Sequence, residues 1–283
     1  MLRPWVVIAA LCGVAVSFSV ARPPVPRLRG NDLRPVLLRP GVINTITVSV
    51  RPLLLDLYWL RSLNAIGEAE SAEKNASLYE YGRLLTDVDP RFYTAYTYIG
   101  LNIPFRTGRS TFVNSDLAAD LFRRGLTQFP DDMKLHLYLG YSLFAQLKQY
   151  KEASAVFLEG SKKKGAPAFM APLAVRLLAH SGEAEDALSM TEEMLANADD
   201  EQSRKDFEGK VAALKIEVAL QVIDRAIAKF TEAEKRPPTS LAELVAKGHY
   251  TGPLFDPTGG MMSIGKDGKA TSESIERRFE VYE

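Results

Sequence analysis

Apolar side chains recur at helical spacing along most of the chain, in stretches that end at prolines or glycines. This pattern predicts about four helical pairs: 53–67 with 71–88, 93–104 with 116–128, 133–147 with 151–163, and 168–180 with 184–196. Proline cannot continue the helix that precedes it, so Pro90, Pro130 and Pro167 mark the ends of successive units. The predicted fold is therefore mostly α.

A short motif repeats within these pairs. Tyr98-Ile99-Gly100 recurs forty residues later as Tyr138-Leu139-Gly140, and each copy precedes an Ala-x3-Phe stretch, Ala118/Phe122 and Ala153/Phe157. A recurring helix-turn-helix unit cannot bury its apolar face alone, so we expect the units to stack. Stacked helical pairs usually present a binding surface rather than a reaction centre.

These residues resemble the tetratricopeptide repeat (TPR) family, whose 34-residue unit carries Leu-Gly, a later Ala-x3-Phe and a closing proline. The third unit agrees best, the second is six residues longer with an insertion at 105–110, and the first and fourth are degenerate. The resemblance covers residues 53–200. It implies a TPR-like helical-hairpin solenoid in which the first helix of each unit lines a concave groove.

On that family pattern the first helices supply the candidate residues of a partner-binding groove. Tyrosine and arginine are frequent binding hot spots. An alternative for Tyr141 and Phe144 is that they are core residues packed between units. The candidates are Arg61, Asn64, Thr97, Leu101, Lys134, Tyr141 and Phe144.

The segments 55–61, 87–92 and 129–132 also resemble a group of membrane-associated or exported bacterial repeat proteins. This resemblance implies an association with the bacterial envelope. It implies no particular chemistry.

Residues 201–283 form a different module in the sequence pattern. A long helix at 201–235 ends before Pro237-Pro238, and a short helix follows with Thr239 or Ser240 as N-cap and Glu243 placed for a capping box. The pattern then predicts strands at 261–264 and 278–282, paired around a turn at 266–269. The prediction is a small α+β C-terminal module.

The order of residues in this module resembles the C-terminal half of the major pseudopilins of type II secretion systems, although the pseudopilin N-terminal methylation signal is absent. In such modules a loop can hold calcium, and Asp256, Asp267 and Ser272 are candidate oxygen donors. Three scattered donors fall short of the six or more that calcium takes. We therefore expect turn chemistry and no metal.

The N-terminus has the layout of a targeting segment. Residues 5–21 are almost wholly apolar after Arg3, so 1–21 is either a signal peptide cleaved after Ala21 or a membrane anchor through 4–21. A third alternative is an apolar helix buried in the fold. If the stretch is retained, the arginines that follow it outnumber Arg3 and favour a cytoplasmic body. The order of its basic, apolar and small-residue regions is that of a secretory signal and favours export. The expected location is the bacterial inner membrane, as an anchored protein, or the periplasm.

Five prolines at 22–40 predict an extended linker, and alternating residues at 42–50 predict a short strand, so 22–52 is expected to connect the N-terminus to the repeats.

Composition removes several function classes. The 35 basic and 35 acidic residues balance, which argues against a nucleic-acid partner. The only cysteine is Cys12, so the body has neither a disulfide nor a thiol-based metal site. His136, His180 and His249 have no histidine partner at helical spacing, and no hydrolase or nucleotide-binding motif is present. We expect no enzyme activity and no cofactor.

The expected function is a non-enzymatic protein–protein interaction scaffold in an envelope or membrane-associated assembly, which binds a segment of a protein partner in the repeat groove. The alternative is a permanent structural subunit of a membrane complex, held by its N-terminal helix.

Overall fold

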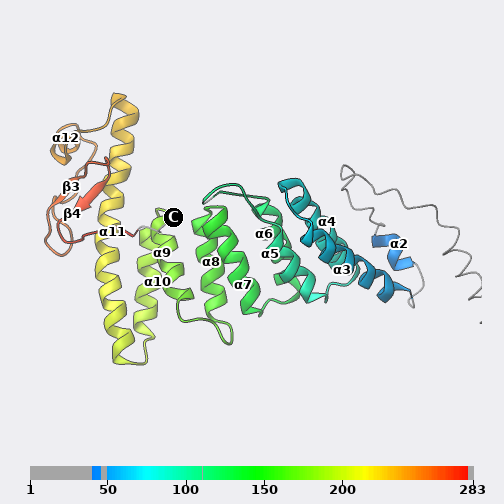
Figure 1. The fold of residues 1–283 in the computed structure, drawn as a ribbon. Helices are drawn as coiled ribbons and strands as arrows, with labels where there is room; N and C mark the ends of the chain where they lie inside the picture. Colours follow the sequence, from blue (N-terminus) through cyan, green and yellow to red (C-terminus); the bar gives the residue numbers. More distant parts are fainter. Residues whose placement is uncertain (1–39, 46–49, 110, 280–283) are drawn as a thin grey trace, which may run out of the picture. The chain divides into compact units, whose positions relative to one another are not determined.

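The computed structural model describes residues 40–45, 50–109 and 111–279, which are mostly helical with two short antiparallel strand pairs (Figure 1). The helical elements are α2 (Pro40–Thr45), α3 (Arg51–Gly67), α4 (Ala72–Val88), α5 (Gly100–Asn102), α6 (Ser115–Gln128), α7 (Met133–Tyr141), α8 (Tyr150–Ser161), α9 (Met170–His180), α10 (Ala184–Ala196), α11 (Glu201–Glu234), α12 (Leu241–Ala246), and the π-helical turns η1 (Ala95–Ile99) and η2 (Ser142–Gln146).

The predicted helices are confirmed in type and order, and α10 begins and ends at the predicted residues. Side-chain caps explain several starts, because a cap oxygen satisfies a free N–H of the first turn. Ser71 accepts from the Lys74 N–H, Asp132 from the Leu135 N–H and Asp200 from the Ser203 N–H.

Two predicted helices are interrupted by wider turns. The helix expected at 93–104 starts with two α-helical residues, 93 and 94, passes through η1 and continues as α5, and the helix expected at 133–147 is α7 followed by η2. A π-helical turn accommodates an extra residue in the helix and is frequent at functional sites.

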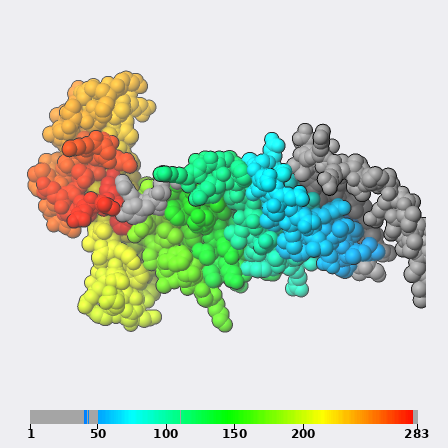
Figure 2. All heavy atoms as spheres, in the orientation of Figure 1, coloured from blue at the N-terminus to red at the C-terminus, as the bar shows by residue number. Residues whose placement is uncertain are grey.

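Consecutive helices pack on one another from α3 to α11. Contacts join α3 to α4, α6 to α7, α7 to α8, α8 to α9, α9 to α10 and α10 to α11. Figure 2 shows the same elements following one another in chain order, coloured from blue to yellow. We call α3, η1 with α5, α7 with η2, and α9 the first helices, and α4, α6, α8 and α10 the second helices.

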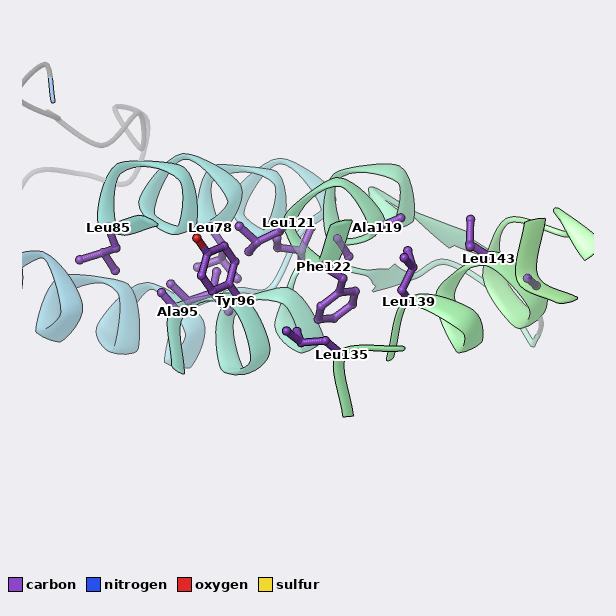
Figure 3. Packing of buried hydrophobic residues seen from close by; sticks show 14 of the residues in the cluster. Leu78, Leu85, Ala95, Tyr96, Ala119, Leu121, Phe122, Leu135, Leu139 and Leu143 are labelled. Carbon is purple, nitrogen blue, oxygen red and sulfur yellow. The ribbon is translucent and has the colours of Figure 1, made fainter. Parts of the chain in front are cut away.

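The repeated sequence motif makes a repeated contact. A Cβ added to Gly100 would lie 2.5 Å from the Phe122 ring, and one added to Gly140 would lie 2.8 Å from the Phe157 ring. Each glycine therefore lets the aromatic ring of its second helix lie directly against the backbone of the first helix. Figure 3 shows the ring of Phe122 among Leu121, Leu135 and Leu139 in the main core.

The strand predicted at 42–50 is wrong over its first part, because Pro40–Thr45 form the helix α2. Proline fits the first turn of a helix, where its missing N–H leaves no bond unmade. Ile43 is fully buried in the main core. Residues 46–49 of the predicted strand lie outside the described residues.

The predicted insertion near 105–110 forms a short hairpin. Strand β1 (Phe105–Arg106) pairs antiparallel with β2 (Phe112–Val113), directly after α5.

The C-terminal module packs on α11. Its own core joins Ile223 and Phe230 of α11 to Leu244 of α12 and Met262 of β3. Strand β3 (Met262–Ile264) pairs antiparallel with β4 (Ala270–Ser272), with Ser263 opposite Thr271. The predicted partner at 278–282 is wrong as far as residue 279, because a tight turn brings 270–272 against β3 first. Residues 280–283 lie outside the described part.

The predicted capping of α12 is present with one difference. Ser240 is the N-cap and its hydroxyl accepts from the Glu243 N–H, but the Glu243 carboxylate accepts from the N–H of Thr239, one residue before the cap. No helix among the described residues is both long and apolar enough to cross a membrane. The expected signal or anchor at 1–21 and the linker as far as residue 39 lie outside those residues.

Candidate functional site

A pocket of about 400 Å³ opens between two successive first helices. The residues around it come from α5, the loop after it, α6, α7 and η2. They are Gly100, Leu101, Pro104, Phe122, Leu137, Tyr138, Tyr141, Ser142 and Gln146. We call it the Leu101–Tyr141 pocket, after its two half-exposed members.

The packing of the repeats produces this pocket. Gly100 admits Phe122 beneath it, and the Phe122 ring lies 5.8 Å from the Tyr138 ring on the next first helix. Leu101 and Tyr141 then remain 51% and 52% exposed. Large apolar side chains exposed beside a cavity are typical of binding surfaces.

One polar group at the pocket has no partner. The Oε1 atom of Gln146 is buried and accepts no hydrogen bond from any residue that the structure describes. Leaving a buried acceptor unsatisfied costs about 1–3 kcal/mol, and because this atom is closed to solvent it does not itself offer a contact to a ligand.

Aromatic side chains extend the apolar surface toward α3. The ring of Trp59 lies 5.4 Å from Phe92 and 6.0 Å from Tyr98, and Tyr98 is 45% exposed. Tyr98 precedes Leu101 by three residues. The surface of α3 is therefore connected to the pocket through the η1–α5 segment.

The structure brings two of the seven predicted site residues together, Leu101 and Tyr141. Lys134 is exposed on α7, seven residues before Tyr141. At 1.5 Å per residue this places it roughly 10 Å along the same face of the helix.

The other four predicted residues lie apart from the pocket. Arg61 and Asn64 are exposed on α3, where the Arg61 guanidinium lies 5.8 Å from the Tyr58 ring centre. Thr97 is half-buried and its hydroxyl donates to the Tyr93 carbonyl. Phe144 is half-buried against the main core, 6.4 Å from the Tyr150 ring.

The sequence interpretation missed Pro104, Leu137, Tyr138 and Gln146. Leu137 and Tyr138 could have been found, because they precede Tyr141 by one helical turn. Pro104 and Gln146 carried no such signal, since their place depends on the hairpin insertion and on the π-helical turn.

A second cavity, of about 460 Å³, lies where α9, α11 and the C-terminal tail meet. Arg278 is bonded on both sides there, through Nη2 to Glu217 Oε1 and through Nη1 to Asp224 Oδ2, each at 2.5 Å. Burial lowers the pKa of Arg278, but the hydrogen bonds to the two carboxylates outweigh it and hold the pKa above its usual value. This arrangement ties the tail to α11.

Gln221 extends the same network to the last hairpin. Its side chain donates to the Ala179 carbonyl at 2.8 Å and accepts from the Ala184 N–H at 3.1 Å. A buried amide with these partners holds α11 against α9 and α10.

Of the three candidate calcium ligands, Asp256 and Ser272 contact each other and Asp267 lies in a separate turn. The Asp256 carboxylate accepts from the hydroxyls of Ser272 and Thr258, whereas Asp267 accepts from the Lys269 N–H in the β3–β4 turn. Burial raises the pKa of Asp256, but these hydrogen bonds and one with Ser274 hold it below its usual range. Within the described residues, no group of three or more His, Cys, Asp or Glu could hold a metal ion.

The three histidines take part in local packing. His136 Nδ1 lies 2.9 Å from the Asp132 carbonyl, the His180 ring stacks edge-on to Tyr150, and the His249 ring does so to Phe230.

No family model, curated protein or solved structure matches this chain. The resemblances to TPR proteins and pseudopilins therefore stay predictions from the residues.

Proposed function

We propose that this chain is a non-enzymatic scaffold that binds a segment of a partner protein along its first helices. The observation that carries the proposal is the Leu101–Tyr141 pocket, an apolar recess with two half-exposed walls beside both π-helical turns. A peptide lying across the first helices could place one apolar side chain there. Residues such as Tyr141 at the rim of an apolar recess are frequent hot spots.

We also propose that residues 53–200 form a TPR-like array of helical hairpins. The repeated contacts Gly100–Phe122 and Gly140–Phe157 support it. Gly125 and Gly160 add a second repeated contact, because each lies against side chains of its own first helix and of the next one. Such an array would present its first helices as a groove.

The proposed setting is a bacterial envelope or membrane-associated assembly, with the chain anchored at the inner membrane or exported to the periplasm. This part rests on the sequence of residues 1–21. If that segment is retained as an anchor, the same surface would serve a permanent subunit of a membrane complex.

The test compares the proteins that co-purify from the native cell in mild detergent with the wild-type chain and with Tyr141→Asp and Leu101→Asp. Leu254→Asp is the matched control, because Leu254 is similarly exposed on the C-terminal module. We expect the pocket variants to retain at least about tenfold less partner, equivalent to ~1.4 kcal/mol, and the control to retain it fully.

Circular dichroism of each variant checks that it is folded. Retention of the same proteins by folded Tyr141→Asp would contradict the proposal. The N-terminal peptide in the same mass spectra distinguishes the two settings, since a retained Met1 means an anchored subunit and a start at Arg22 means export.

A further inference from the structure

Charge is divided unequally between the two sets of helices. The first helices carry four basic residues, Arg51, Arg61, Lys134 and Arg176, and one acid, Asp56. The second helices carry five bases and eleven acids. The bases are Lys74, Arg83, Arg123, Arg124 and Lys151, and the acids are Glu73, Glu80, Asp87, Asp116, Asp120, Glu152, Glu159, Glu185, Asp186, Glu192 and Glu193.

Ion pairing sharpens this division. On the second helices, Arg83 and Arg124 both pair with Asp87, Arg123 pairs with Glu152, and Lys151 pairs with Glu183. These four of the five bases are neutralised within the protein.

The exposed bases of the first helices are different. Arg61, Lys134 and Arg176 pair with no carboxylate that the structure describes, although Arg61 lies over the Tyr58 ring. Their charges are available to a binding partner.

Lys134 connects this charge to the pocket. It shares one face of α7 with Leu137 and Tyr141, because residues three, four and seven apart lie in one stripe. A segment that reaches the pocket along α7 would pass beside the Lys134 ammonium group. Exposed unpaired charge steers oppositely charged partners and sets specificity.

We propose, resting on the function proposed above, that the partner segment is an acidic peptide whose aromatic anchor enters the Leu101–Tyr141 pocket. Its carboxylates lie near Lys134 and along the other first helices. The apolar lining receives the ring.

The probes are three sets of fluorescent peptides of equal length, each with one central tryptophan. The flanking residues are Asp and Glu in one set, Ser and Gly in the second, and Lys and Arg in the third. We expect the acidic set to bind most tightly to the full chain, with an affinity that falls as salt is added. Replacing the central tryptophan by alanine removes the ring and should weaken binding at least about tenfold.

Two variants separate charge from anchoring. Lys134→Glu should weaken the acidic set about fivefold and leave the neutral set unchanged. Tyr141→Ala should weaken both sets. Lys229→Glu makes the same charge change at an exposed site on α11, and it should alter neither.

Equal affinity for all three sets would overturn the acidic preference and leave the proposed function standing. If none of the three peptide sets binds, the inference is overturned. The co-purification experiment with Tyr141→Asp still tests the proposed function separately. The acidic α10 could occupy the same face of a second copy. In that case the wild-type chain would form oligomers as its concentration rises, and both Lys134→Glu and added acidic peptides would dissociate them. This result would assign the face to self-association and overturn the proposal of a partner segment.

Discussion

At the residue scale, two glycines decide how closely the helices of a unit approach. Gly100 and Gly140 lie against the rings of Phe122 and Phe157, and no side chain fits between backbone and ring. Close-packed interiors respond even to one added methyl group. The glycine of the repeated motif is therefore a packing requirement.

Gly140→Ala should lower the free energy of unfolding by about 1–3 kcal/mol, because its new Cβ would lie 2.8 Å from the Phe157 ring. Urea unfolding followed by circular dichroism measures the change. The matched control is Gly209→Ala on α11, where a Cβ meets nothing within 4 Å. That control should gain about 0.5–1 kcal/mol from helix propensity, and a loss equal to that of Gly140→Ala would refute the packing argument.

At the element scale, tyrosine hydroxyls join neighbouring units. Tyr79 on α4 donates to Asp120 on α6 at 2.5 Å, and Tyr93 donates at 3.3 Å to Asp132, the N-cap of α7. Burial, together with the neighbouring carboxylate, raises the pKa of each tyrosine from 10.0 to about 12. The folded protein therefore favours the neutral phenol.

This predicts a loss of stability in alkali. A raised folded-state pKa gives a contribution that is complete below about pH 10 and is lost as the pH rises to about 12. The double variant Tyr79→Phe/Tyr93→Phe should lose less stability across that window than the wild type, as measured by urea unfolding at each pH. Tyr98→Phe is the control, since the Tyr98 hydroxyl donates to no described carboxylate. If the free energy of unfolding of the double variant falls with pH as steeply as that of the wild type, these hydrogen bonds do not cause the loss of stability.

At the scale of the whole molecule, α11 joins the helical hairpins to the C-terminal module. Gln221 binds the last hairpin, and Arg278 ties the tail to Glu217 and Asp224. The side chain of Glu217 is only 4% exposed. Its charge therefore depends on Arg278 for compensation.

Arg278→Leu should destabilise the protein by about 3–5 kcal/mol, because it leaves the buried Glu217 carboxylate without its ion-pair partner. Adding Glu217→Leu should recover part of the loss. The control is Arg225→Leu, which removes only an exposed pair with Glu185 and should cost less than about 1 kcal/mol. Chemical denaturation gives the free energies, and equal losses in Arg278→Leu and Arg225→Leu would show that the ion pair does not hold the tail.

The local sequence was sufficient for most helices. Spacing of apolar residues, together with the prolines and glycines that end each stretch, predicted their type and order, since these signals act within a few residues. It failed at α2, where alternation at 42–50 suggested a strand but Ile43 enters the core from a helix. It also failed for the partner of β3, because the tight turn after β3 pairs it with β4 and not with residues 278–279.

Leu101 and Tyr141 were each predicted from their place on a first helix, and the repeated Gly and Phe positions were visible in the sequence. Only the tertiary structure places these two side chains in one pocket. It also leaves Gln146 Oε1 without a partner and brings Arg278 to Glu217 and Asp224. The physical reason is range. Helix signals act over one or two turns, whereas these contacts join residues far apart in the chain that meet only after the helices have packed.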